Sequence, residues 1–255
     1  YIFGIDLLQA TDAGLWIAYM AATTILLASL VAIKKDNLKA RLAYSTISQL
    51  SYIILGAMMA SSLGILGGAM HIVMHAFGKI TLFFCAGAIM VACHKTEISQ
   101  MNGLGRKMPI TFICFLIASL SIIGLPPFGG VWSKWYLALA AADTGQVIFV
   151  AVLMISSLLN VAYLIPIVVR AFYNDPDPET HDDHNDQDDH GHVAVATHHP
   201  SDAGGANQWK IGNLREAPIA CVGALAFTAM GCFVLFFYAD RIQTFLLPIL
   251  EGTNG

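Results

Sequence analysis

The chain has 255 residues, of which 56% are hydrophobic and only 12% are charged, and its formal net charge is −4. Soluble globular domains carry about 25% charged residues, so this composition excludes an ordinary soluble domain. Several apolar runs of about 20 residues instead predict a polytopic membrane protein. No stripe of basic residues is present, and we therefore expect no nucleic-acid partner.

Six apolar segments follow one another along the chain and predict an all-α bundle of transmembrane helices. The expected spans are residues 15–33, 42–60, 65–93, 110–142, 147–172 and 217–238. The fourth is one long span or two half-helices, because it is interrupted near Gly124-Pro127. The chain then divides into a five-span part (1–172), an acidic His-rich hydrophilic loop (173–216), and a last transmembrane helix with its tail (217–255).

Basic residues set the expected orientation. Lys and Arg gather in the loops after the first and third spans, at residues 34–41 and 94–109, whereas the turns after the second and fourth spans carry none. By the positive-inside rule the basic loops are cytoplasmic, and both chain ends then face outward. The chain begins at Tyr1 and shows no signal peptide, so we expect it to be a piece of a longer chain.

The third span carries three titratable residues, His71, His75 and Lys79. They fall at positions i, i+4 and i+8, so a helix places them on one face with a rise of about 6 Å per step. A lysine at the centre of a transmembrane helix costs about 2.5–3.5 kcal/mol on insertion, so its presence indicates a function. Histidine titrates near neutral pH, and we interpret the three residues as a proton relay.

Different roles for this helix face stay open. An HxxxH pair can bind zinc, but this pair lacks the glutamate of HExxH, and no Asp or Glu lies inside any span to complete a site, so we expect no metal. Structural histidines held by hydrogen bonds, and a packing lysine paired with a backbone carbonyl, are the competing interpretations. Proton carriers usually pair a base with an acid, so we expect the missing acid outside this sequence.

A second lysine, Lys134, follows a break in the fourth apolar segment. The break contains Gly124, Pro126, Pro127, Gly129 and Gly130. These residues remove backbone donors and let the chain bend. A broken helix at membrane depth occurs only where it is buried in protein or lines a wet cavity, and one interpretation is a lysine that exchanges protons in a hydrated channel. The alternative is a lysine at a span end that reaches the interface beside Trp132 and Trp135.

The second span begins with a polar stripe, made of Ser45, Ser48, Gln49 and Ser51. We assign Ser45, Ser48 and Gln49 to the lining of the channel, where they would hydrogen-bond to its waters. The alternative is contact between helices, at about 0.6 kcal/mol for each residue. The hydrophilic loop is dense in Asp and His, which fits loose binding of divalent metal or, as we expect, a disordered connector.

Three stretches, KARLAYSTISQLSY (39–52), HIVMHAFGKITLF (71–83) and GLPPFGGVWSK (124–134), carry a resemblance when taken together. They resemble consecutive motifs of the antiporter-like subunits of respiratory complex I (NADH-quinone oxidoreductase) and of the Mrp-type monovalent cation/proton antiporters. The residues of these motifs are most similar to those of the D-type subunit of these antiporters. The resemblance extends from the first span through the fifth and implies the C-terminal part of a longer protein.

The resemblance implies a fold and a role for each site residue. The fold is the second of two inverted repeats, with its broken helix at Gly124-Pro127. Lys134 is then the terminal lysine that faces the exit half-channel, and His71 and His75 form the central relay. The sequence departs from the family by lacking the first repeat with its glutamate–lysine pair, so we expect no transport by this sequence alone.

The implied function is proton conduction by a membrane subunit, in exchange for Na⁺ in the antiporters or coupled to NADH:quinone oxidoreduction in complex I. The implied partners are other membrane subunits and the lipid bilayer, and the implied location is the bacterial inner membrane. No quinone, flavin or iron–sulfur site is visible, so we expect no cofactor here and assign any redox reaction to partner subunits. The alternatives are a structural or assembly subunit that does not transport, and a divalent-metal transporter that uses the acidic loop.

Overall fold

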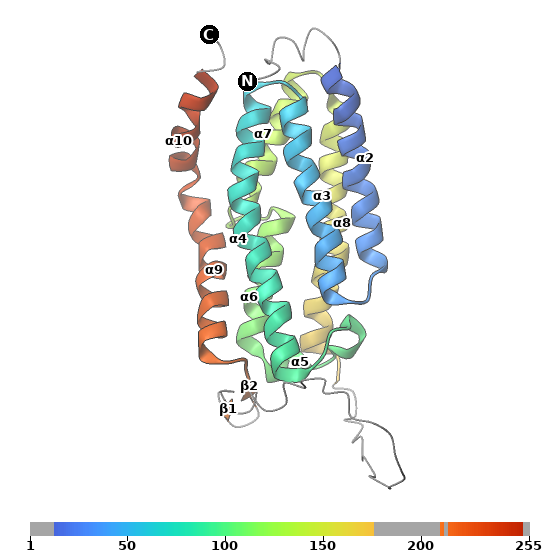
Figure 1. Ribbon diagram of the computed structural model, residues 1–255, viewed down its shortest axis with the longest axis vertical. Helices are drawn as coiled ribbons and strands as arrows, with labels where there is room; N and C mark the ends of the chain where they lie inside the picture. Colours follow the sequence, from blue (N-terminus) through green and yellow to red (C-terminus); the bar gives the residue numbers. More distant parts are fainter. Residues whose placement is uncertain (1–12, 176–209, 212–213, 252–255) are drawn as a thin grey trace, which may run out of the picture.

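The computed structural model describes residues 13–175, 210–211 and 214–251, and it is a bundle of helices that run along one long axis (Figure 1). The main helices are α2 (Ala13–Lys34), α3 (Leu38–Met58), α4 (Ser62–Cys93), α6 (Pro109–Ile123), α7 (Gly130–Asp143), α8 (Val147–Tyr173), α9 (Ile219–Phe237) and α10 (Ala239–Glu251). A 3-10 turn (Ile98–Gln100) and the short α5 (Leu104–Lys107) connect α4 to α6. The expected all-α transmembrane bundle is confirmed.

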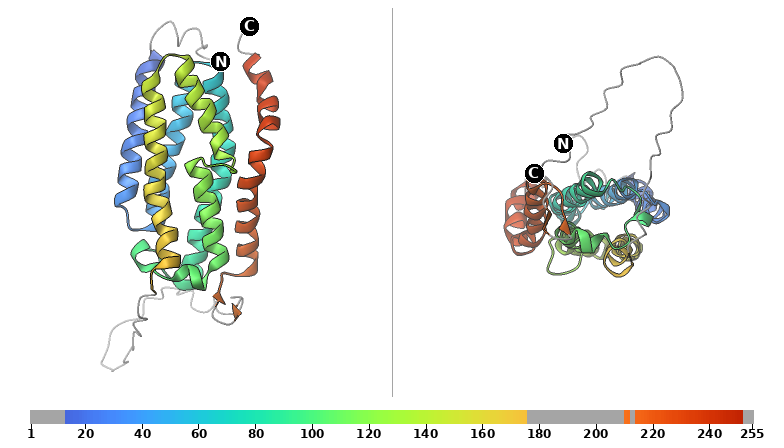
Figure 2. Two further views of the ribbon diagram at one scale, coloured as in Figure 1. Left: turned by 180° about the vertical axis from the view of Figure 1, so that it is seen from behind. Right: turned by 90° about the horizontal axis from the view of Figure 1, so that it is seen from below.

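Helices α2, α4, α8 and α9 are the four described helices that are long and apolar enough to cross a membrane. Helix α3 has 21 residues and a more polar composition, because it carries the polar stripe. Helices α6 and α7 have 15 and 14 residues and stack end to end along the bundle (Figure 2). Thus α3 and the stacked pair occupy the places of the second and fourth expected spans.

The break expected near Gly124-Pro127 is present, since α6 ends at Ile123 and α7 begins at Gly130. Gly124 adopts a φ of 89°, in the left-handed region that a residue without a Cβ enters at no steric cost. The N–H of Gly129 donates to the Cys232 carbonyl at 3.0 Å, which ties the break to α9. The fourth expected span is therefore two half-helices rather than one.

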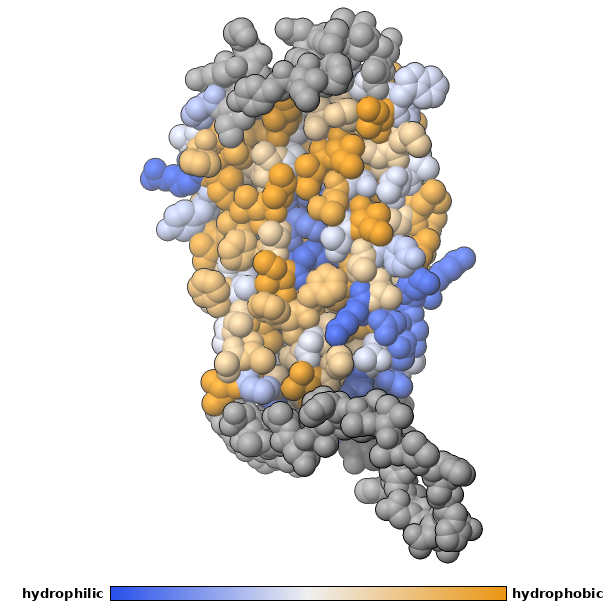
Figure 3. Space-filling model, viewed as in Figure 1, coloured by the Kyte–Doolittle hydropathy of each residue, from blue (hydrophilic) through white to orange (hydrophobic). Residues whose placement is uncertain are grey.

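The two basic loops lie at the same end of the bundle, one between α2 and α3 and the other between α4 and α6 (Figure 1). The start of α2 and the end of α10 lie at the opposite end (Figure 1). On the face shown in Figure 3, apolar residues cover most of the surface and hydrophilic residues gather toward the lower end. Large exposed side chains such as Trp16 (76%) and Phe227 (75%) fit contact with lipid or with neighbouring subunits.

The C-terminal region is more ordered than the sequence indicated. A tail was expected after residue 238, but α10 continues in the direction of α9 and packs against α4 (Figure 1). In the hydrophilic segment, β1 (Lys210–Ile211) and β2 (Leu214–Arg215) form a short antiparallel pair. Residues 176–209, which carry most of the Asp and His, lie outside the described residues.

Glu216 fastens the end of the hydrophilic segment to α6. It is 3% exposed, and its carboxylate accepts hydrogen bonds from the N–H of Ile110 (2.8 Å) and the hydroxyl of Thr111 (2.7 Å). A carboxylate at a helix N-terminus satisfies free backbone donors and interacts favourably with the helix dipole. This contact fixes where α9 starts beside α6.

The core consists of apolar clusters separated by a polar layer. One large cluster includes Leu42 of α3 and Leu82 of α4, and a second includes Leu55 of α3 and Leu153 of α8. A third, smaller cluster lies between α4 and α10. Between these levels the central helices place polar side chains inside the bundle. That layer is the candidate functional site, because polar and ionisable groups at membrane depth are costly to bury and are usually functional.

Candidate functional site

The polar layer crosses the middle of the bundle, and we call it the polar belt. Its members are Ser45, Gln49, Tyr52, His71, His75, Lys79, Ser133, Lys134, Ser156, Ser157, Asn160 and Tyr163, from α3, α4, α7 and α8. All four predicted proton carriers are in it, at exposures of 3% (His71), 6% (His75), 5% (Lys79) and 9% (Lys134). The structure therefore brings the two histidines and two lysines into one buried region.

Lys134 sits where the broken helix opens. Its ammonium donates to the Ile123 carbonyl at 3.0 Å and to the Ser157 hydroxyl at 3.1 Å. In a continuous helix the Ile123 carbonyl would accept from the residue four positions on, but that residue is Pro127, which has no N–H. The break thus supplies an acceptor for a charged lysine inside the bundle. This burial contradicts the alternative in which Lys134 reaches the membrane interface.

Aromatic rings connect Lys134 to the histidines. The Lys134 ammonium lies 5.2 Å from the centroid of the Tyr52 ring, close enough for a cation–π interaction. The Tyr52 ring stacks on His71, with centroids 5.2 Å apart and planes at 9°. His71 in turn stacks on His75, at 5.5 Å and 21°. Because His71 and His75 are one helical turn apart on α4, they form a continuous file leading away from Lys134.

The contacts of His71 are compatible with a proton on Nδ1. The Ser133 hydroxyl donates to the Gly130 carbonyl at 3.1 Å, and its oxygen lies 3.0 Å from His71 Nδ1. A serine hydroxyl has a single proton, so in this pattern Nδ1 is the donor and carries the hydrogen. Nε2 is then the nitrogen that receives a proton, and it is buried with no hydrogen-bond partner among the described residues.

His75 lies between the other carriers. It is near enough to His71, Lys79 and Lys134 for their charges to act on it. Both of its ring nitrogens are buried, and neither has a hydrogen-bond partner in the described part of the chain. Buried polar groups are normally satisfied by protein or by water, so a water-bridged histidine fits this geometry better than a structural histidine held by protein.

Lys79 is held from α3. Its ammonium donates to the Leu42 carbonyl at 3.2 Å and to the Ser45 hydroxyl at 2.6 Å. The contact with the Leu42 carbonyl is the one expected of a packing lysine paired with a backbone carbonyl. The contact with Ser45 goes beyond that role, because it continues to a further side chain. The Ser45 hydroxyl lies 2.8 Å from the Tyr163 hydroxyl, which is also hydrogen-bonded to Asn160 of the same helix. Lys79 is therefore joined to α8 through α3.

The polar stripe of α3 divides into two faces. Ser45 and Gln49 lie in the polar belt, and the Gln49 amide donates to the Asn160 side-chain oxygen at 3.4 Å. Ser48 turns instead to α2, where it bonds to the Ile25 carbonyl and lies 2.9 Å from the Ser29 hydroxyl. The structure thus does not bring Ser48 to the lysines and gives it the role of a contact between helices.

Sequence reasoning missed several members of the polar belt. Tyr52 and Ser133 lie within the motifs quoted above but were given no role, and no residue of the expected span 147–172 was singled out. A signal was nevertheless present on α8, because Ser156, Asn160 and Tyr163 are spaced four and three residues apart and share a helix face. The same period that identified the α4 residues would have identified this stripe.

Gly130 permits the close approach of the half-helices, and its replacement is expected to be destabilising. A Cβ at this position would lie 1.9 Å from the Ser121 carbonyl oxygen. We expect Gly130→Ala to lower the free energy of unfolding by about 1–3 kcal/mol or more, because backbone cannot yield as a side-chain tip can. The measurement is the thermal unfolding midpoint of the full-length protein in detergent.

Gly87→Ala on α4 is the matched control, since nothing lies within 4 Å of a Cβ built there. Alanine within a helix is favoured over glycine by about 0.5–1 kcal/mol, so this variant should keep or raise the midpoint. Equal midpoints for both variants would contradict the packing described at the break.

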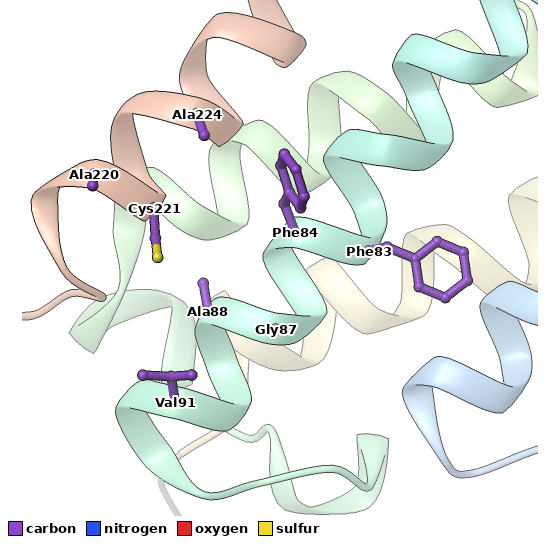
Figure 4. Close-up of a pocket in the computed structure, with 8 residues that line it drawn as sticks. All are labelled: Phe83, Phe84, Gly87, Ala88, Val91, Ala220, Cys221 and Ala224. Carbon is purple, nitrogen blue, oxygen red and sulfur yellow. The ribbon is translucent and has the colours of Figure 1, made fainter. Parts of the chain in front are cut away.

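A separate groove lies between α4 and α9 (Figure 4) and has a volume of about 400 Å³. Its lining residues are Phe83, Phe84, Gly87, Ala88 and Val91 of α4 and Ala220, Cys221 and Ala224 of α9. These side chains offer apolar surface and, apart from one thiol, nothing that exchanges protons at neutral pH. The groove is therefore unrelated to the chemistry of the polar belt.

Known proteins resemble this chain over most of the region that forms the belt. Residues 2–160 match the family described as NADH:quinone oxidoreductase/Mrp antiporter, TM. The NADH-quinone oxidoreductase subunit N of Desulforudis audaxviator is 40% identical over 156 residues, which are 61% of this chain and 31% of that subunit. Subunit L of Rickettsia bellii is 35% identical over 158 residues, 62% of this chain and 24% of that subunit. The chain thus spans about a third of these relatives or less.

Solved structures share the fold. The Mrp complex from Dietzia sp. DQ12-45-1b matches with a TM-score of 0.75 at 23% identity, over 94% of this chain and 46% of that chain. Respiratory complex I from Thermus thermophilus matches with a TM-score of 0.72 at 18% identity, over 95% and 44%. Since the family match alone covers more than half of the sequence, the chain belongs to the NADH:quinone oxidoreductase/Mrp antiporter family of transmembrane proteins.

Proposed function

We propose that this chain is part of a membrane subunit that conducts protons through the polar belt, with Lys79, His75, His71 and Lys134 as the carriers. The observation that supports this most strongly is the burial of all four side chains inside a transmembrane bundle. Inserting these side chains into a membrane costs free energy, and a bundle with a purely structural role would be more stable without them. The unpartnered nitrogens of His71 and His75 add acceptors for mobile protons.

The proton steps follow from the contacts. A proton leaves Lys79 and reaches His75 through water, because neither His75 nitrogen has a partner among the described residues. From His75 it passes to Nε2 of His71, and the proton on Nδ1 then leaves toward Lys134, so that the ring is again neutral with its proton on Nε2. Lys134 then receives a proton and is stabilised as a cation by the Ile123 carbonyl. Lys79 ends neutral, Lys134 ends charged and both histidines end neutral, so the net result is movement of one proton from Lys79 to Lys134.

Two coupled activities fit this role. Exchange of protons for Na⁺ corresponds to the Mrp-type relatives, and coupling to NADH:quinone oxidoreduction corresponds to the complex I relatives. In either case other membrane subunits are the partners, the lipid bilayer surrounds the bundle, and the bacterial inner membrane is the location. The assignment to the D-type antiporter subunit, and the 1–172, 173–216 and 217–255 division, stay predictions.

A structural or assembly subunit that does not transport is the second candidate, since the polar belt contains bases but no carboxylate among its described residues. The test is proton transport by the full-length protein in its complex, in everted membrane vesicles, with Lys79→Met and Lys134→Arg as variants. Loss in both variants supports conduction. Wild-type transport in both supports the structural subunit.

Deletion of residues 175–199 tests whether the acidic loop takes part in transport. We expect proton transport to be retained, because the described polar belt makes its contacts without this segment and the ion pair at its start, Arg106 to Asp175 at 3.8 Å, joins exposed side chains. Transport is measured in the same vesicles, with zinc and manganese uptake followed in parallel. Loss of divalent-metal uptake on deletion would instead support a metal transporter.

A further inference from the structure

Polar groups of α3 and α8 form a second file beside the histidines. Starting from the Lys79 ammonium, the file passes to Ser45 at 2.6 Å and from there to the Tyr163 hydroxyl at 2.8 Å. Tyr163 is hydrogen-bonded to Asn160, which also accepts from Gln49 at 3.4 Å. None of these side chains is more than 5% exposed. This file leaves Lys79 without touching either histidine.

The other end of the file reaches Lys134. Ser157 of α8 accepts from the Lys134 ammonium at 3.1 Å. Because α3 and α8 run antiparallel, Ser45 and Tyr163 lie at one level and Tyr52 and Ser157 at another, about 10 Å further along the bundle. The two lysines are therefore the ends of both files, the histidine file on α4 and the hydroxyl–amide file on α3 and α8.

The middle of this file contains polar atoms that protein leaves unsatisfied. Gln49 Oε1, the Tyr52 hydroxyl, Ser156 Oγ and Asn160 Nδ2 are all buried and have no hydrogen-bond partner among the described residues. The Tyr52 hydroxyl faces Gln49, Ser156 and Ser157 without reaching hydrogen-bond geometry with any of them. Donors and acceptors gathered in this way are the surroundings that a buried water requires.

We propose that this hydroxyl–amide file is a second proton branch between Lys79 and Lys134, completed by water between Gln49, Tyr52 and Ser156. The inference rests on the proposed proton conduction and adds a route that bypasses the histidines. In the structure the Tyr163 hydroxyl donates to Ser45, so it first turns away from Ser45 toward the water. Lys79 then gives a proton to Ser45 as the Ser45 hydroxyl proton moves to Tyr163 and the Tyr163 proton moves to water. The water passes a proton to neutral Lys134, so Lys79 ends neutral, Lys134 ends charged and no other group changes.

Tyr163→Phe tests the branch, because it removes the hydroxyl and keeps the ring. Proton transport is measured with the full-length protein in its complex, in the wild-type background and in a His71→Leu/His75→Leu background. We expect Tyr163→Phe alone to reduce transport by about twofold to tenfold, and the histidine variant to keep a measurable rate. Combining all three substitutions should remove the remaining transport, since neither branch is then intact.

Tyr136→Phe is the matched control, since Tyr136 also donates a hydrogen bond, to Gln243 at 2.7 Å, but on the α10 side of α7. It should leave transport unchanged in both backgrounds. If Tyr163→Phe reduced the transport rate by the same factor in both backgrounds, the effect would be structural and the second branch would be overturned. The second branch would also be overturned if Tyr163→Phe changed the rate in neither background. Complete loss of proton transport in the His71→Leu/His75→Leu variant, with Tyr163 intact, would also overturn the second branch. Transport that survives Lys134→Arg would instead overturn the proposed function itself.

Discussion

Lys134→Arg is expected to reduce proton transport by at least about 100-fold, the scale set by loss of a proton-transfer group, while the chain still inserts and folds. Arginine keeps a positive charge that can donate to the Ile123 carbonyl, the contact that Lys134 makes at 3.0 Å. It cannot act as a carrier, because a guanidinium does not release its proton in proteins. The measurement is proton transport in everted vesicles that contain the full-length protein in its complex.

Lys134→Ala should abolish transport as well and should also destabilise the bundle. The Ile123 carbonyl loses its donor because Pro127 cannot supply one, and an unsatisfied buried acceptor costs about 1–3 kcal/mol. Lys39→Ala is the control, since Lys39 is an exposed lysine on α3. Wild-type transport in Lys134→Arg would contradict a carrier role for Lys134.

Lys79→Met is expected to abolish transport, also by about 100-fold or more, without lowering stability. Lys79 is the shared end of both proposed branches, so its loss interrupts both. Methionine has a similar length and fills the same space. The groups that Lys79 contacts still have hydrogen-bond partners in the variant, because Tyr163 donates to Ser45 and the Thr46 hydroxyl donates to the Leu42 carbonyl. Transport and the unfolding midpoint are measured on the same preparation.

The thermal unfolding midpoint distinguishes Lys79→Met from Lys134→Ala. Removing a buried lysine that costs about 2.5–3.5 kcal/mol to insert should leave the Lys79→Met midpoint unchanged or higher. A loss of transport together with a higher midpoint cannot be assigned to misfolding. A large drop in the midpoint with full transport would show that Lys79 is a packing residue, as the backbone-carbonyl alternative holds.

The sequence was sufficient for features that lie within one segment. The i, i+4, i+8 spacing of His71, His75 and Lys79 placed them on one face of α4, and all three are buried there. The prolines after Gly124 predicted the break, because they remove the donors a helix needs at that point. In both cases the cause is local backbone geometry, which a sequence reports directly.

Features that depend on how two helices pack together were harder to predict from the sequence. The stripe on α3 predicted neither that Ser48 would turn to α2 nor that Ser45 would bridge Lys79 to Tyr163, because rotation of a helix is set by its neighbours. The acceptor of Lys134 is a carbonyl 11 residues earlier, which becomes available only through the folded break. The helix α10 was missed because Asp240, Arg241 and Gln243 shorten its apolar run.

In the proposed mechanism, protons cross the polar belt through water held by its unpartnered groups. The most direct measurement is an electron cryomicroscopy map of the complete complex at a resolution that shows ordered water. We expect water within hydrogen-bond distance of the His75 nitrogens, Gln49 Oε1 and the Tyr52 hydroxyl. A map that shows ordered water elsewhere in the bundle, with side chains closed over these atoms and no water beside them, would contradict it.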